Sequence, residues 1–90
     1  MATPEVILLT ADDVKIRFTF QSCGFFTASL VPSSFGCDPI TIISDVARIQ
    51  SSTASRFEIY FDKALFEFPH SELEKFKEFL SVVEAVKDAA

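Results

Sequence analysis

The sequence predicts an α+β fold: an antiparallel sheet of five or six strands followed by one C-terminal amphipathic helix. Apolar and polar residues alternate in several stretches between residues 6 and 68, which is typical of half-buried strands. From residue 71 the apolar spacing changes to three and four, with no Gly or Pro to interrupt it. The chain has 90 residues, of which 49% are apolar, so we expect residues 1–90 to form a single domain around one core.

Each strand is expected where the alternation is clearest and ends at polar or Pro-containing segments. Asp12 with Asp13, and Asp62 with Lys63, are turn signals between neighbouring strands. The segment from Ser44 onward is ambiguous, because it fits either a bulged continuation of the preceding strand or a short strand of its own. The strands are predicted at about residues 6–9, 14–21, 25–31, 40–49, 56–61 and 65–68.

The helix is expected over about residues 71–88. Ser71 and Glu74 have the spacing of a capping box, in which a hydroxyl and a carboxylate satisfy free backbone amides at the helix start. The apolar residues that follow cover about half of the helical circumference, which suits a helix packed on a sheet. They are Leu73, Phe76, Phe79, Leu80, Val83 and Val86.

The chain contains eleven Phe, one Tyr and no Trp. Most Phe residues occur at the inward-facing spacing of a predicted strand or helix, so we expect them to form the core. Phe25 lies on the face opposite to Phe26, and Phe35 lies in a predicted loop, so these two have no clear place inside. The Phe residues expected inside are Phe18, Phe20, Phe26, Phe57, Phe61, Phe66, Phe68, Phe76 and Phe79.

The second half of the chain resembles PH-like and GRAM-like domains over residues 40–87. The resemblance rests on a strand, the pattern Asp45-Val46-x-x-Ile49, an aromatic hairpin and a capped helix beginning at Glu72-Leu73-Glu74-Lys75-Phe76. It implies a bent sheet forming a partly open barrel that is closed by the terminal helix. The chain departs from the family in having six recognisable strands rather than seven and no Trp in the helix. A flat sheet covered by one helix is the alternative with the same elements.

The charge pattern excludes several classes of ligand. PH domains that bind phosphoinositides carry basic residues between the first two strands, where this chain has Asp12 and Asp13, so such binding is not expected. The formal charge of −5 and a pI near 4.6 also argue against a nucleic-acid partner. No apolar run approaches the about 20 residues of a membrane helix, so we expect no membrane insertion and a cytoplasmic location.

The residue types that support catalysis or metal binding are sparse. His70, the single histidine, is expected to be exposed at the helix entrance, and Cys23 and Cys37 are expected to be reduced, small apolar residues. Glu72 and Glu74 are expected to be solvated, whereas acid–base catalysis needs a desolvated carboxyl group. With two glycines there is no phosphate-binding loop. We therefore expect no enzyme activity, no cofactor and no metal.

The leading hypothesis is a non-enzymatic protein-interaction or regulatory domain that acts through sheet edges and surface side chains. Tyr60 and Arg56 lie on the polar face of the predicted hairpin and belong to residue types that are enriched at binding hot spots. Phe25 and Phe35 complete the candidate partner-binding set. The uncharged stretch 25–37 is the expected exposed or partner-covered edge, and homodimerisation by the same route is a further expectation.

Two alternatives come from other functional classes. A Phe-lined sheet under a helix would suit a carrier of a small apolar ligand if the rings leave a cavity. An acidic inhibitor that imitates nucleic acid is the third hypothesis, supported by 13 acidic against 8 basic residues.

Overall fold

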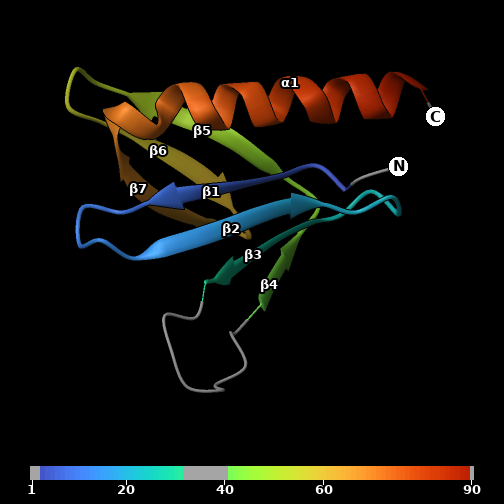
Figure 1. Cartoon of the computed structure of the whole chain (residues 1–90), viewed down its shortest axis with the longest axis horizontal. Helices are drawn as coiled ribbons and strands as arrows, with labels where there is room; N and C mark the ends of the chain where they lie inside the picture. The colour runs from blue at the N-terminus through green and yellow to red at the C-terminus, as the bar shows by residue number, and fades with distance from the viewer. Residues whose placement is uncertain (1–2, 32–40, 90) are drawn as a thin grey trace.

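The protein forms seven strands and one long helix (Figure 1), in a computed structural model that describes residues 3–31 and 41–89. The helix α1, Leu73–Ala89, follows a single 3-10 turn at His70–Glu72. The strands are β1 Glu5–Leu9, β2 Lys15–Phe20, β3 Phe26–Leu30, β4 Thr41–Ser44, β5 Ala47–Ser52, β6 Arg56–Phe61 and β7 Ala64–Pro69. The predicted α+β class is confirmed.

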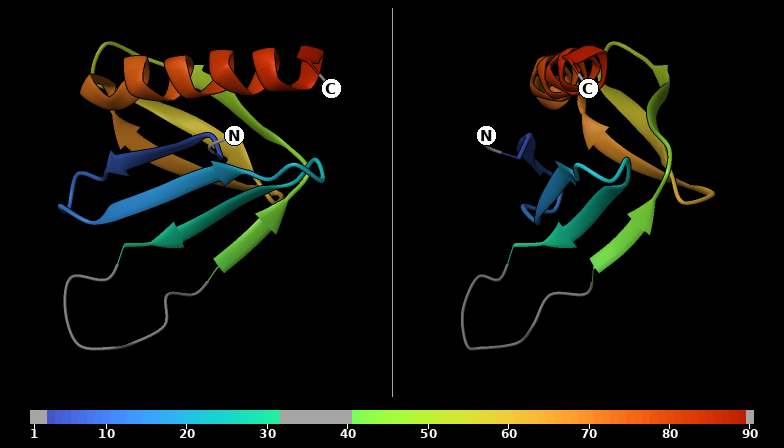
Figure 2. Two further views of the ribbon diagram at one scale, coloured as in Figure 1. Left: turned by 45° about the vertical axis from the view of Figure 1, so that its right-hand side comes forward. Right: turned by 90° about the vertical axis from the view of Figure 1, so that its right-hand side faces the viewer.

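The strands divide into two antiparallel sheets, with the order β1-β2-β3-β4 in one and β5-β6-β7 in the other. Helix α1 packs against β1. The right-hand view of Figure 2 shows the helix end-on, above the side on which the two sheets diverge. β7 lies next to β1, so the sheets also approach each other through these two strands.

The single strand given for residues 40–49 is two strands, because the chain changes sheets within it, and of the two readings of the segment after Ser44 the separate strand is the correct one. β4 ends at Ser44 and β5 begins at Ala47. Ser44 is only 7% exposed, and its Oγ donates to the carbonyl of Val46 at 2.8 Å. The same Oγ accepts the N–H groups of Val46 and Asp62, each at 3.1 Å. With one donated and two accepted bonds the hydroxyl is fully satisfied, and it stabilises the bend that produces the seventh strand.

The inward-facing Phe residues form the core, as predicted. Phe18 lies at its centre, with ring centroids 5.7 Å from Phe61, 6.0 Å from Phe68 and 5.5 Å from Phe76, all edge-to-face. Phe66 is half-buried. The other buried Phe residues are Phe20, Phe26, Phe57 and Phe79.

The start of the helix differs from the predicted capping box. Pro69 precedes a 3-10 turn that contains Ser71, and this turn has no side-chain cap. Glu72 is buried rather than solvated: its Oε1 accepts the Leu9 N–H at 2.8 Å and its Oε2 lies 3.1 Å from Lys75 Nζ. The prediction that Glu72 is solvated is wrong because the start of the helix lies against the end of β1, and this contact joins residues that are distant in sequence.

The uncharged stretch 25–37 is not a sheet edge in its described part. β3 pairs with β2 on one side and with β4 on the other, so both sides of its backbone are occupied. The edge strands are instead β1 and β4 in one sheet and β5 and β7 in the other.

Candidate functional site

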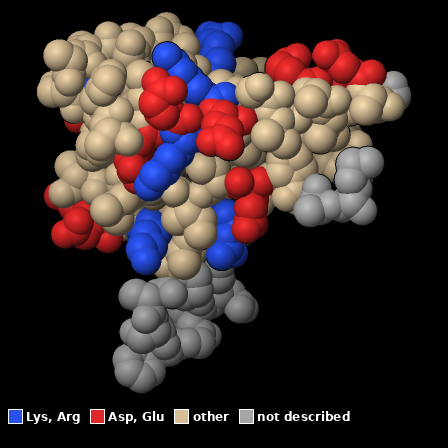
Figure 3. Space-filling view, turned by 45° about the horizontal axis from the view of Figure 1, so that its top comes forward, with Lys and Arg blue, Asp and Glu red and all other residues tan. Residues whose placement is uncertain are grey.

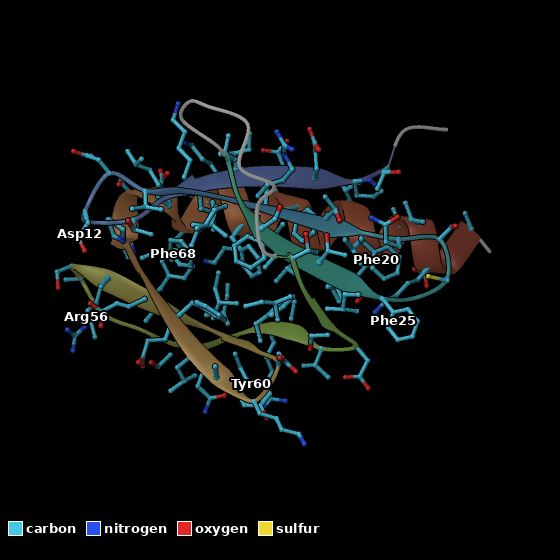
Figure 4. The ribbon with its side chains drawn as sticks, turned by 90° about the horizontal axis from the view of Figure 1, so that it is seen from below. Asp12, Phe20, Phe25, Arg56, Tyr60 and Phe68 are labelled. Carbon is cyan, nitrogen blue, oxygen red and sulfur yellow. The ribbon has the colours of Figure 1, made fainter. Side chains whose placement is uncertain are left out.

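Two of the predicted partner-binding residues, Phe25 and Tyr60, line one surface groove. The groove lies where the chain passes from the first sheet to the second and has a volume of about 360 Å³. We call it the corner groove. Figure 4 shows Phe25 and Tyr60 coming from different sheets, with Arg56 near the other end of β6. The groove is lined by Phe25, Ile43, Ser44, Asp45, Val46, Tyr60, Asp62 and Lys63.

Phe25 is placed by the turn between β2 and β3. Gly24 has φ of +99°, a left-handed conformation that residues with a Cβ rarely adopt. Its N–H donates to the Gln21 carbonyl at 2.9 Å, and the Gln21 N–H donates to the Phe25 carbonyl at 2.7 Å. The turn therefore ends with Phe25 46% exposed, one residue before the buried Phe26.

Tyr60 lies on the outer face of β6, where it pairs with Arg48 of β5 and with Leu65 of β7. The Arg48 guanidinium carbon is 4.6 Å from the centroid of the Tyr60 ring, which is the geometry of a cation–π contact. The ring is half-buried. Leu65 beside it is 53% exposed, so the apolar surface continues from the groove onto the outer face of the second sheet.

The rim of the groove includes the tight turn between β6 and β7. Asp62 and Lys63 both have positive φ, +50° and +63°, as a two-residue hairpin turn of this type requires, although neither is a glycine. Asp45 follows Ser44 directly, and the Asp62 N–H is bonded to Ser44 Oγ, so both acidic residues lie at the same corner. Within residues 3–31 and 41–89, no ion pair involves Asp45, Asp62 or Lys63.

Ile43 is a site residue that the sequence analysis missed. It is 59% exposed, more than any other large apolar side chain in the described part of the chain. Ile42 and Ile43 are both apolar, so alternation alone does not reveal which of them faces the core. The pairing of Ile42 with the buried Ala28 places Ile43 on the outer face, opposite Thr27.

The other two predicted site residues do not join this groove. Arg56 lies at the start of β6, opposite Pro69, and its Nη1 is 3.3 Å from Glu67 Oε2 in an exposed ion pair. Such an exposed pair contributes little to stability. It directs the Arg56 guanidinium toward Glu67. Phe35 lies outside the described residues, as does Cys37.

Residue types that could support catalysis or metal binding are not clustered in the described part of the chain. No group of three or more His, Cys, Asp or Glu side chains in residues 3–31 and 41–89 is arranged to hold a metal ion. His70 is exposed, as expected, and Cys23 is exposed in the turn before Phe25. Side chains of both signs lie next to one another near the centre of the face seen in Figure 3. None of the described helices has the length and apolarity needed to cross a membrane.

A second hollow of about 360 Å³ lies between β1 and α1, and we call it the helix-side groove. Its lining includes the charged residues Glu5, Lys75 and Glu78, and the exposed Val82. Both hollows are open to solvent at the surface, whereas the space between the sheets is occupied by Phe rings.

Seven antiparallel strands in two sheets, with a C-terminal helix packed on β1, are consistent with PH-like topology. Comparisons of the chain with protein-family models, curated proteins and solved structures found no match.

Proposed function

We propose that this protein is a small non-enzymatic binding domain of the PH-like superfold, and that it binds a protein partner through the corner groove. One observation carries the proposal: Phe25 and Tyr60, 35 positions apart, one in the turn before β3 and the other on β6 of the second sheet, line the same groove as the highly exposed Ile43. An aromatic pair beside an aliphatic side chain is typical of the centre of a protein interface.

The energetics of the groove support a binding role. Removing a large apolar side chain fully from water contributes about 1.5–3 kcal/mol. Phe25 and Ile43 retain 46% and 59% of their surface, so a partner has substantial apolar area to cover. Arg48 restrains the Tyr60 ring before binding, which reduces the conformational entropy that the complex would lose.

The carrier alternative has less support. A carrier needs an enclosed apolar cavity, whereas five of the Phe side chains between the sheets and helix are less than 2% exposed and pack on one another. The inhibitor that imitates nucleic acid has less support as well, because such a protein needs a surface of one sign and Figure 3 has both signs on one face.

The experiment is recovery of the partner from the native host by the immobilised protein, followed by mass spectrometry and affinity measurement with purified partner. Phe25→Ala and Tyr60→Ala are each expected to weaken binding about 10-fold or more, as hot-spot truncations do. Val82→Ala is the matched control, since Val82 is also 46% exposed but lies in the helix-side groove. A partner that loses affinity with Val82→Ala and not with Phe25→Ala would contradict the proposal.

A further inference from the structure

Three of the four edge strands carry features that hinder the pairing of another strand. At the β1 edge, the Leu9 N–H is bonded to the Glu72 carboxylate. β5 contains a register shift between Ile49 and Ser51, and a bulge of this kind disturbs further pairing. β7 ends in Pro69, which has no N–H, and lies against β1.

The fourth edge strand, β4, has none of these features in its described residues. Its sequence Thr41-Ile42-Ile43-Ser44 is β-prone and uncharged, contains no Pro, and pairs with β3 without a register shift. β4 is therefore the described edge on which a further strand meets the fewest obstacles.

The backbone alternation shows which β4 residues would pair. The Gln21 N–H donates to Phe25 and the Val31 N–H donates to Lys15, so the odd-numbered residues of β3 direct their backbone groups toward β2. The even-numbered residues then face β4, and Ala28 is opposite Ile42. It follows that the N–H and C=O of Ile43 point away from β3, at the same position whose side chain lines the corner groove.

The charges that line the corner groove favour a basic partner segment. Asp45, Asp62 and Lys63 line the groove with no ion pair to a described residue, so acidic groups outnumber basic ones there, and the whole chain carries a formal charge of −5. A basic side chain on the incoming strand would complement the carboxylates of Asp45 and Asp62. A second copy of the chain would instead add its own −5, so electrostatics disfavours self-pairing.

We propose that the partner presents an extended segment that adds as a strand to the edge of β4 that pairs with no described strand. Its apolar side chain packs against Phe25, Ile43 and Tyr60 in the corner groove, and a neighbouring Lys or Arg lies beside Asp45 and Asp62. This inference rests on the proposed function and adds the binding mode and the chemistry of the bound segment. Main-chain hydrogen bonds supply affinity in strand addition, and the side chains supply specificity.

The test uses a phage-displayed library of random 12-residue peptides selected on the full chain, with synthetic peptides made from the recovered sequences. The recovered peptides are expected to alternate apolar residues with Lys or Arg, and to slow hydrogen exchange of the Ile43 amide. Asp45→Asn and Asp62→Asn are each expected to weaken binding by several-fold at low salt, and to do so less at high salt because the attraction is screened.

The backbone contact is tested by Ile43→Pro against Ile43→Val. Proline removes the outward N–H, which an edge position tolerates, and is expected to reduce affinity about 10-fold or more. Valine keeps the N–H and most of the apolar side chain, so Ile43→Val is expected to weaken binding much less than Ile43→Pro. Should Ile43→Pro fail to fold, peptides N-methylated at alternate residues decide instead, because only one of the two alternating sets faces β4.

The outcomes separate this inference from the proposed function. Strand addition is overturned if the peptides lose affinity for Phe25→Ala but bind Ile43→Pro normally, and if N-methylation of either alternating set leaves their affinity unchanged. The groove would then remain the binding surface. Recovered peptides without basic residues overturn the charge assignment. Dimerisation of the chain in sedimentation velocity, abolished by Ile43→Pro, would show that the edge pairs with a second copy and would also overturn the inference.

Discussion

The Oγ of Ser44 accepts the backbone N–H of Asp62 at 3.1 Å, across the corner where the two sheets meet. Through its two further bonds to Val46, the same hydroxyl links the end of β4, the start of β5 and the turn between β6 and β7. Because Ser44, Val46 and Asp62 all line the corner groove, this one side chain connects the bend of the fold to the shape of the candidate site.

Ser44→Ala is expected to lower the free energy of unfolding by about 1 kcal/mol or more, because it leaves part-buried backbone groups of Val46 and Asp62 without their partner. Urea denaturation measures the change. Ser51→Ala is the control, since the Ser51 hydroxyl bonds Glu58 at an exposed position and its loss should cost about 0.5 kcal/mol or less. Equal losses in the two variants would mean that the corner does not depend on the Ser44 hydroxyl.

Glu72→Ala is expected to destabilise the protein by about 1–3 kcal/mol, because the Leu9 N–H loses its acceptor at the edge of β1. Glu72→Gln keeps an oxygen that accepts this N–H and should retain most of the stability, although it loses the ion pair with Lys75. Hydrogen exchange at the Leu9 amide distinguishes the variants: protection falls in Glu72→Ala and persists in Glu72→Gln. Loss of protection in both would indicate that the negative charge is required.

Phe18→Ala is expected to cost about 3–5 kcal/mol, the usual range for removing a fully buried ring, since Phe18 contacts three other core rings. Phe25→Ala should cost much less, about 1 kcal/mol or less, because Phe25 is 46% exposed and lies outside the core. Thermal unfolding of both variants checks the contrast. If Phe25→Ala lowered the free energy of unfolding as much as Phe18→Ala does, Phe25 would belong to the core and would not be a binding residue of the corner groove.

Lys63→Gly is expected to stabilise the protein by about 0.5–1 kcal/mol, because glycine adopts the positive φ of this turn position without a Cβ clash. Lys77→Gly is a control of opposite sign. Lys77 lies in the interior of α1, where glycine costs about 1 kcal/mol relative to good helix formers. Denaturation midpoints of the two variants should therefore move in opposite directions, and a loss of stability in Lys63→Gly would contradict the strain assigned to this turn.

Local patterns predicted most of the fold. Alternation identified the faces of β2 and β6, and the change of period located the helix to within a few residues. The same patterns did not decide at Ser44 between a bulged continuation and a separate strand, and they failed at Glu72, which was expected in solvent. Both positions are decided by hydrogen bonds between residues far apart in sequence, Ser44 with Asp62 and Glu72 with Leu9.

The candidate site was predictable only in part. Aromatic side chains that face away from the core can be recognised by their position in a pattern, and Phe25 and Tyr60 were singled out in this way. How the two sheets are joined brings Phe25 and Tyr60 into one groove and adds Ile43 to it. The same arrangement places Arg56 away from the groove, in an ion pair with Glu67.

The sequence by itself determined the fold class, the inward faces and the Phe-rich core, because hydrophobic periodicity acts over neighbouring residues. The tertiary structure alone decided where the chain changes sheets, which edges remain open and which exposed side chains share a surface. These features arise from contacts between distant segments, and the buried Ser44 hydroxyl is the clearest example. A residue pattern identifies which face of a strand or helix points into the core. Which outward-facing side chains lie close together depends on how the strands and the helix pack in the folded chain.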